Sequence, residues 1–248
     1  MASVTMIAKN AEQPRGGFIS PKRMKKEHYS DGVILKEENI SPNTVGMAVD
    51  YLARVAMGTE PEKAFAISLR GADLSGHGAE AKDLVDGIKG LDDESIRNAC
   101  RLVGFDQVVR AGIMDPGMYG FSVPDDATCQ NIRTMVERTV KFFEIHGPVL
   151  IDGVTFIGGY TDTVTSGDGD YVTEDTIWDL KVSKSEPTSK YTLQLAMYFL
   201  MGKRSVWPEL QELKKIGIFN PRLNASYSFD MGTLETSTVS QIEKIIGY

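Results

Sequence analysis

Apolar residues recur every three or four positions through most of the first half of the chain, which is the spacing of helices with one buried face. Ser41 and Pro42 suit the cap and the first turn of such a helix, and Gly58 suits its end. The same spacing predicts further helices over residues 61–67, 79–88, 93–103 and 128–145. Residues 112–127 are rich in Gly and Pro and are predicted to form a loop.

The period of the apolar pattern falls to about two after residue 148, as in strands that bury one face. This pattern predicts strands over residues 149–151, 154–164, 176–183, 216–219 and 225–229. Residues 189–201 are predicted to be a helix that ends at Gly202, and residues 236–246 a closing helix. The order of these elements predicts an α/β fold in which helices pack on a sheet, with a helix-rich N-terminal half.

Residues 1–40 are polar. They include four basic residues close together, Lys22, Arg23, Lys25 and Lys26. Charge clusters of this kind are usually solvated, so the segment is predicted to be a flexible or loosely docked basic arm. No stretch rich in Pro and Ser divides the remainder, so 41–248 is predicted to be a single domain. Its helical part would cover 41–146 and its sheet core 147–248.

A composition of 42% hydrophobic and 25% charged residues is that of a soluble globular protein. The chain has no run of about 18 apolar residues, and its N-terminus lacks the apolar core of a signal peptide. We therefore expect a cytoplasmic protein with no membrane partner. Two cysteines, Cys100 and Cys129, are too few to hold a metal cluster by themselves.

The net charge of −7 argues against a nucleic-acid partner for the chain as a whole. A binding surface is local, however, and residues 178–204 carry five basic side chains against two acidic ones. Lys184 and Lys190 within this stretch are the candidate contacts to a nucleic-acid backbone.

Two carboxylates and a lysine in the predicted sheet are suited to metal chemistry. Alternate residues of a strand point to the same face, so Asp179 and Lys181 project together. If the turn at 167–169 pairs its flanking strands, Asp162 comes beside Asp179. Adjacent carboxylates repel each other unless a cation binds them, and Mg²⁺ (or Mn²⁺) prefers oxygen ligands. Lys181 would orient a metal-bound water or stabilise extra charge on a phosphate.

A helix with a paired Gln and Tyr follows this strand. The combination of G-x-x-D at 159–162, D-L-K at 179–181 and Q-x-x-x-Y at 194–198 resembles the PD-(D/E)XK nuclease superfamily, in particular its RecB-type and lambda-exonuclease-type branch. The resemblance implies a restriction-endonuclease-like core, in which a central mixed β-sheet is flanked by helices. It also implies metal-dependent cleavage of DNA phosphodiester bonds, with Gln194 and Tyr198 near the DNA.

The same resemblance implies roles for the residues around the metal. Asp162 and Asp179 would be ligands together with the backbone carbonyl of Leu180, and Lys181 would be the lysine of the motif. Similar enzymes add an acid or a histidine from a preceding helix. Glu137 is the candidate for that position in the catalytic centre, against the alternative of an ordinary exposed glutamate.

The small size of the chain and the lack of a helicase motif favour an exonuclease-like enzyme of phage or mobile-element type. It would act in DNA recombination, with a partner protein or as a homo-oligomer. The alternative is a catalytically inactive protein of the nuclease fold that binds DNA or a protein partner. A Ser–His–Asp hydrolase is disfavoured by the lack of a G-x-S-x-G motif, and a glycosidase would leave Lys181 without a role. The motifs leave open exo- or endonuclease action, its polarity, and DNA or RNA as substrate.

Overall fold

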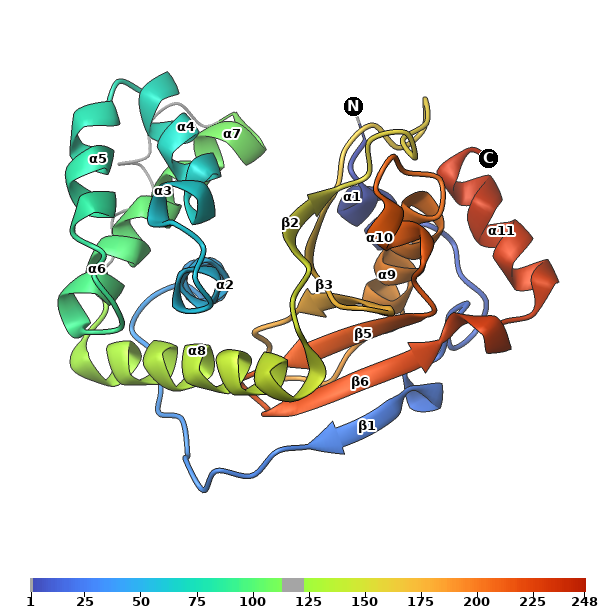
Figure 1. Ribbon diagram of the computed structural model, residues 1–248, viewed down its shortest axis with the longest axis horizontal. Helices are drawn as coiled ribbons and strands as arrows, with labels where there is room; N and C mark the ends of the chain where they lie inside the picture. The colour runs from blue at the N-terminus through green and yellow to red at the C-terminus, as the bar shows by residue number, and fades with distance from the viewer. Residues whose placement is uncertain (1, 113–122) are drawn as a thin grey trace. The chain divides into compact units, whose positions relative to one another are not determined.

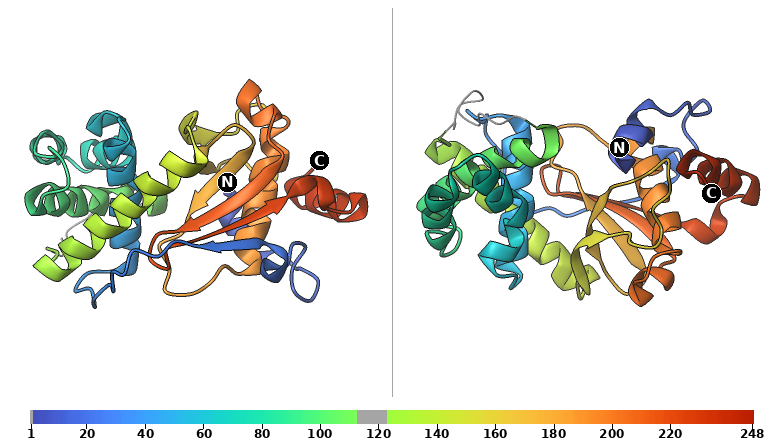
Figure 2. Two further views of the ribbon diagram at one scale, coloured as in Figure 1. Left: turned by 60° about the horizontal axis from the view of Figure 1, so that its bottom comes forward. Right: turned by 90° about the horizontal axis from the view of Figure 1, so that it is seen from above.

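The structure is a computed structural model that describes residues 2–112 and 123–248 (Figure 1). Contacts divide the chain into two compact units. We call Met1–Tyr29 together with Phe142–Tyr248 the sheet unit, and Ser30–Lys141 the helical unit. These boundaries differ from those of the predicted arm and the predicted single domain. Figure 2 shows the strands of the sheet unit from two further sides.

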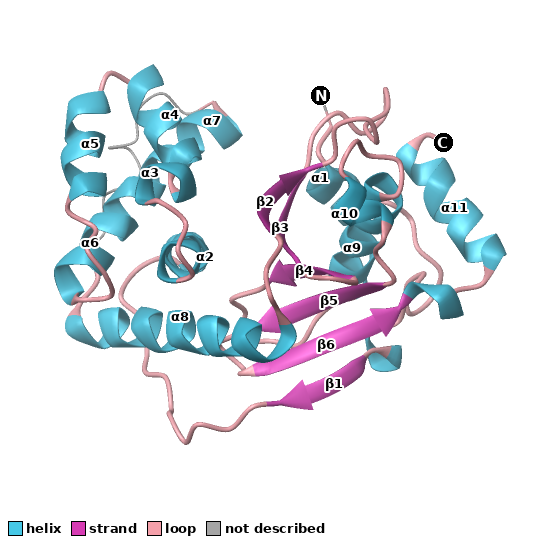
Figure 3. Cartoon of the chain, in the orientation of Figure 1, coloured by secondary structure: helices cyan, strands magenta, loops and turns pink. Residues whose placement is uncertain are grey.

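The sheet unit is built on a six-stranded sheet with the strand order β1-β6-β5-β4-β3-β2 (Figure 3). Its strands are β1 (Lys25–His28), β2 (Ile151–Thr155), β3 (Asp168–Val172), β4 (Thr176–Leu180), β5 (Lys215–Asn220) and β6 (Ala225–Asp230). β4 and β5 run parallel and the other neighbouring pairs are antiparallel, so the sheet is mixed. The predicted α/β fold with a central mixed sheet flanked by helices is confirmed.

Helix α9 (Ser189–Gly202) packs against β4 and β5 and lies in the hydrophobic core of the sheet unit. Every residue from 192 to 202 is buried, which explains the largely apolar sequence of this helix. β4 is buried at every position, as expected for a strand covered on both faces. Further helices in contact with α9 are α1 (Val4–Asn10), α10 (Pro208–Gln211) and α11 (Thr236–Ile246).

The segment predicted as a loose arm over 1–40 is instead a folded part of the protein. Val4 of α1 is fully buried, and the hydroxyl of Thr192 in α9 donates to the carbonyl of Ile19 at 2.6 Å. β1 pairs with β6 at the edge of the sheet. The sequence pattern does not predict β1 because its polar side chains are largely exposed and backbone hydrogen bonds hold it in place.

The chain between β2 and β3 does not form the strand predicted over 154–164. β2 ends at Thr155, and Gly158 then adopts a positive φ of 90°. A Cβ on Gly159 would lie 2.2 Å from the backbone carbonyl oxygen of Met201 in α9, so only glycine allows this close approach. The chain therefore leaves the sheet here, and the turn predicted just after this segment is replaced by the start of β3.

The helical unit confirms the predicted helices between residues 41 and 146, except that the helix predicted over 61–67 is two helices, the second of which continues to Leu74. They are α2 (Pro42–Ala56), α3 (Pro61–Ala64), α4 (Ala66–Leu74), α5 (Gly78–Asp86), α6 (Asp93–Leu102), α7 (Asp106–Ala111) and α8 (Asp126–His146), the last of which continues into the sheet unit. Short 3₁₀ helices in the chain are η1 (Pro21–Arg23), η2 (Val103–Phe105) and η4 (Met231–Thr233). The buried carboxylate of Asp106 accepts hydrogen bonds from the hydroxyls of Tyr51 (2.6 Å) and Ser68 (2.5 Å), and Arg110 Nε lies 3.2 Å away as its counter-charge. Most of the loop predicted over 112–127 lies outside the described residues.

None of the helices within 2–112 and 123–248 is both long enough and apolar enough to cross a membrane.

Gly217 on β5 provides a test of the packing between the two parallel strands. A Cβ at this position would lie 2.2 Å from the ring of Trp178 on β4. We expect Gly217→Ala to lower the free energy of unfolding of the sheet unit by about 1–3 kcal/mol, the usual cost of overpacking. Both tryptophans, Trp178 and Trp207, lie in the sheet unit, so urea unfolding followed by tryptophan fluorescence measures this change.

A matched control is Gly90→Ala, because a Cβ at Gly90 meets nothing within 4 Å. We expect its fluorescence-detected unfolding curve to coincide with that of the unmodified protein. Equal unfolding curves for Gly217→Ala and the unmodified protein would show that β4 and β5 pack less tightly than described.

Candidate functional site

The site is centred on Asp179, a carboxylate buried in β4 with only 3% of its surface exposed. Lys181 follows two residues later on the same face, and its Nζ lies 2.7 Å from Asp179 Oδ2. Burial by itself would lower the pKa of the Lys181 ammonium, but attraction to Asp179 and Asp170 outweighs burial and raises that pKa. Lys181 is therefore a cation at neutral pH.

Helix α9 supports Asp179 from the core side. Gln194 Nε2 donates to Asp179 Oδ1 (3.3 Å) and to the hydroxyl oxygen of Tyr198 (3.0 Å), one helical turn further on. Burial, followed by the nearby charges of Asp179 and Asp168, raises the pKa of Tyr198 well above its ordinary value, so the phenol stays neutral. The structure thus brings together Asp179, Lys181, Gln194 and Tyr198, as predicted.

The positions of Gln194 and Tyr198 refine the role expected for them. Only 6% of Gln194 and 2% of Tyr198 is exposed, and their polar atoms bond to each other and to Asp179. Side chains buried in this way orient the carboxylate and present little surface to a ligand. We therefore treat Gln194 and Tyr198 as positioning residues.

The second carboxylate of the site belongs to Asp170, on β3. The antiparallel register pairs Tyr171 with Trp178, and one further step along it sets Asp170 opposite Asp179. Cross-strand neighbours of this kind share a face of the sheet. The backbone N–H of Leu180 also donates to Asp170 Oδ2 at 2.7 Å. Asp170 is half-buried.

The prediction that Asp162 lies beside Asp179 is corrected by this register. Asp162 is exposed in the loop between β2 and β3, where the neighbouring hydroxyl of Thr161 donates to the carbonyl of Ile246 at the end of α11. The physical reason is the early end of β2, which removes Asp162 from the sheet. A second G-x-x-D runs from 167 to 170, and its spacing from Asp179 suits a tight hairpin, so the sequence held the signal for Asp170.

The other predicted residues lie at the margins of this cluster or in the other unit. Lys184 and Lys190 are exposed, in the segment after β4 and in the first turn of α9. Leu180 is buried, with its N–H bonded to Asp170. Glu137 is exposed on α8 in the helical unit.

Tyr191 belongs to the site and was not among the predicted residues. Its ring centroid lies 5.2 Å from Lys181 Nζ, a cation–π distance. Tyr191 precedes Gln194 by three positions and Tyr198 by seven, so the three residues share one face of α9. The helical spacing was the available signal.

The cluster has the charge and donor chemistry for one hard cation. Two carboxylates face one ammonium, which leaves a net charge of −1 at Asp170, Asp179 and Lys181. Elsewhere in the described residues, as here, no three His, Cys, Asp or Glu side chains come together as a ready metal site. Comparisons with family models, curated proteins and solved structures return no match to this chain. The chemistry is therefore inferred from the geometry of the cluster.

Tyr198 and Tyr227 allow a matched test of the support that α9 gives to Asp179. Both are buried tyrosines of the sheet unit, but the Tyr198 hydroxyl accepts a hydrogen bond from the buried Gln194, whereas the Tyr227 hydroxyl interacts with Lys26, whose side chain is partly exposed. We expect Tyr198→Phe to lower the free energy of unfolding by about 1 kcal/mol, the worth of a buried hydrogen bond, and Tyr227→Phe to lower it by less than half of that. Fluorescence-monitored urea unfolding measures both, and equal losses would refute the described hydrogen bond.

Proposed function

We propose that this protein is a divalent-metal-dependent nuclease that hydrolyses DNA phosphodiester bonds. The observation that carries the proposal is the juxtaposition of Asp170 and Asp179 on neighbouring strands, with the Lys181 ammonium 2.7 Å from Asp179. Paired carboxylates next to a lysine combine a cation site with a positive group for a phosphate.

The side chains fit Mg²⁺ (or Mn²⁺). Asp170 and Asp179 supply carboxylate oxygens, and the carbonyl of Leu180 between Asp179 and Lys181 is a further oxygen donor in the same strand. Magnesium is usually held by one or two carboxylates and keeps several waters, so a set of two carboxylates suits it. When bound, such an ion lowers the pKa of its water and neutralises charge on a phosphate.

The other side chains of the site have separate roles in positioning the carboxylate, stabilising charge and binding DNA. Gln194, held by Tyr198, fixes one oxygen of Asp179 in place. Lys181 stays protonated because of the neighbouring carboxylates. Its ammonium is placed to orient an attacking water and to stabilise charge on the reacting phosphate. Lys184 and Lys190, both exposed, would contact the DNA backbone on either side.

Such an enzyme would act in the cytoplasm as an exonuclease-like DNA-processing enzyme of phage or mobile-element type. We expect DNA as its substrate and a recombination protein, or a second copy of the chain, as its partner. A protein that binds DNA without cutting it is the second candidate. It is favoured by the exposure of Glu137, the residue predicted to complete the metal site.

Cleavage assays with the metal site altered test the proposal directly. We expect degradation of linear DNA in Mg²⁺ or Mn²⁺, complete loss in EDTA, and a fall of at least about 100-fold in rate for Asp170→Asn, Asp179→Asn and Lys181→Met, as for other groups that stabilise the reacting charge. Asp162→Asn is the matched control, because it removes the same charge from an exposed loop. Full activity of Asp170→Asn would refute this assignment, and DNA binding without cleavage in either metal would favour the second candidate.

Metal binding can be measured apart from catalysis. An ion that binds only the folded state stabilises it, by about 2.7 kcal/mol at a concentration 100 times its Kd. We therefore expect Mg²⁺ to raise the Tm of the sheet unit, followed by tryptophan fluorescence, and expect Asp170→Asn to abolish the rise. Asp162→Asn should keep it. A rise that persists in Asp170→Asn but disappears in Asp162→Asn would place the metal at the loop instead.

A further inference from the structure

One carboxylate oxygen of the proposed metal site is already engaged by a cation of the protein itself. Asp179 Oδ2 is a buried atom, and the Lys181 ammonium lies 2.7 Å from it. The other oxygen of this carboxylate, Oδ1, accepts a hydrogen bond from Gln194. An ion from solvent therefore reaches Asp179 Oδ2 only after a neighbouring side chain has moved.

The ammonium and a metal ion repel each other if they share this oxygen. Magnesium binds oxygen at about 2.0–2.1 Å, so with the ammonium at 2.7 Å the two cations would lie within about 5 Å of each other. Like charges at that separation in a partly buried site repel strongly. The Lys181 side chain is a flexible chain of four carbons, whereas Asp179 is held by Gln194, so Lys181 is the group that moves.

Tyr191 offers the displaced ammonium a second favourable position. The centroid of its ring lies 5.2 Å from Lys181 Nζ, near the outer end of the cation–π range of about 6 Å. The ammonium can therefore approach the ring more closely once it leaves Asp179. The Tyr191 side chain is half-buried and packs against the hydrophobic core of the sheet unit, which restricts the motion of the ring.

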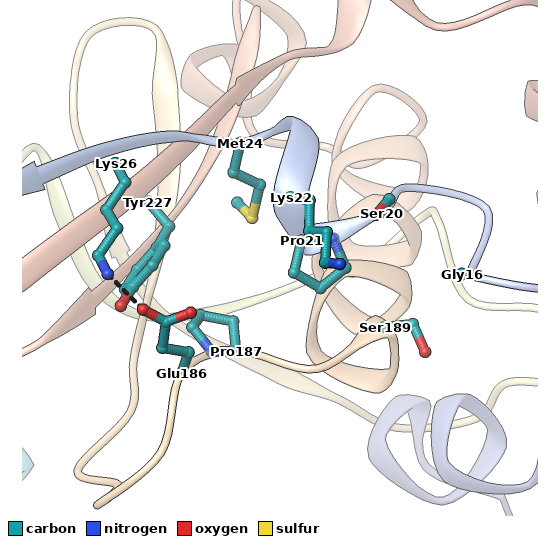
Figure 4. Close-up of a pocket in the computed structure, with 10 residues that line it drawn as sticks. All are labelled: Gly16, Ser20, Pro21, Lys22, Met24, Lys26, Glu186, Pro187, Ser189 and Tyr227. Atoms are coloured by element: carbon teal, nitrogen blue, oxygen red, sulfur yellow. Dashed lines mark hydrogen bonds and ion pairs between the residues drawn. The ribbon is translucent and has the colours of Figure 1, made fainter.

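The start of α9, which carries Tyr191, is attached to the N-terminal segment. The hydroxyl of Thr192, the next residue, donates to the carbonyl of Ile19 at 2.6 Å. Just before the helix, Glu186 forms an ion pair with Lys26 of β1 (Figure 4). These contacts on both sides of Tyr191 hold its ring in place while the lysine side chain moves.

We propose that the Lys181 ammonium occupies Asp179 in the metal-free protein and moves toward the ring of Tyr191 when a divalent ion binds. Lys181 is then a competitor of the metal ion, and Tyr191 is a positioning residue that acts through Lys181. This inference rests on the proposed metal site at Asp170 and Asp179, and it does not require DNA cleavage.

Measurements of metal affinity test the competition without a cleavage assay. We expect the Kd for Mg²⁺, from isothermal titration calorimetry of the full chain, to fall at least about tenfold in Lys181→Met, because the repelling charge is gone. Lys181→Gln keeps a polar group beside Asp179, serves if the Met variant fails to fold, and should change the Kd in the same direction. Lys181→Arg keeps the charge and should not tighten binding.

A double-mutant cycle tests the role of Tyr191. We expect Tyr191→Leu to weaken Mg²⁺ binding about two- to fivefold, the worth of an exposed cation–π interaction. Tyr191→Phe keeps the ring and should restore the original Kd. In the Lys181→Met background, Tyr191→Leu should leave the Kd unchanged, because no ammonium is present to receive. A purely structural role of Tyr191 would instead weaken binding equally in both backgrounds.

Phe199 provides a matched control on the same helix. The centroid of its ring lies 5.3 Å from Lys203 Nζ, so it makes a similar cation–π contact with a different lysine. We expect Phe199→Leu to leave the Kd for Mg²⁺ unchanged.

Two results would overturn the proposal. One is an Mg²⁺ affinity that is equal or weaker in folded Lys181→Met and Lys181→Gln, which includes the absence of measurable Mg²⁺ or Mn²⁺ binding to any of these proteins. The other is an effect of Tyr191→Leu that persists in the Lys181→Met background. Tighter metal binding by Lys181→Met in a protein that cleaves no DNA would refute the proposed nuclease and support this inference.

Discussion

The antiparallel pairing of β3 with β4 is the interaction on which the candidate site depends. Its register sets Asp170 opposite Asp179, and the Leu180 N–H fixes the Asp170 carboxylate at the end of β4. The register of β3 against β4 therefore determines which carboxylates are neighbours. Because a shift by one residue would turn every side chain of the strand to the opposite face, the pairing leaves no freedom in which acids meet.

Helix α9 couples this constraint to the core of the sheet unit. A buried carboxylate is costly unless it is paired and hydrogen-bonded. Asp179 is paired with Lys181, which directly follows β4, and is hydrogen-bonded to Gln194 on α9. Fixing the carboxylate therefore requires the helix to be seated on β4 and β5. The segment that seats it includes α1, so residues far away at the N-terminus contribute to the position of Asp179.

Local periodicity was sufficient for the parts of the site that lie on one element. The D-L-K strand and the Gln194–Tyr198 helix face follow from periods of two and 3.6, and both are as predicted. The choice between Asp162 and Asp170 depended on where β2 ends. After β2, Gly159 packs against the backbone of Met201, a contact between residues 42 positions apart that periodicity does not contain, although the second G-x-x-D at 167–170 was a local signal for Asp170. The edge strand β1 was not predicted, because it is held by backbone pairing with the distant strand β6 and its polar side chains show no apolar alternation.

The distribution of charge makes an acidic chain compatible with the polyanionic substrate that we propose. The net charge of −7 sets only the average field, which salt screens beyond about 10 Å. In the proposed enzyme the carboxylate pair would attract a cation, and the ion would turn the centre of the site positive toward a phosphate. The exposed side chains of Lys184 and Lys190 follow β4 in the sequence. In the proposed nuclease, the carboxylate pair would repel nucleic acid until a metal ion bound there, so metal occupancy and affinity for the substrate would be linked by charge.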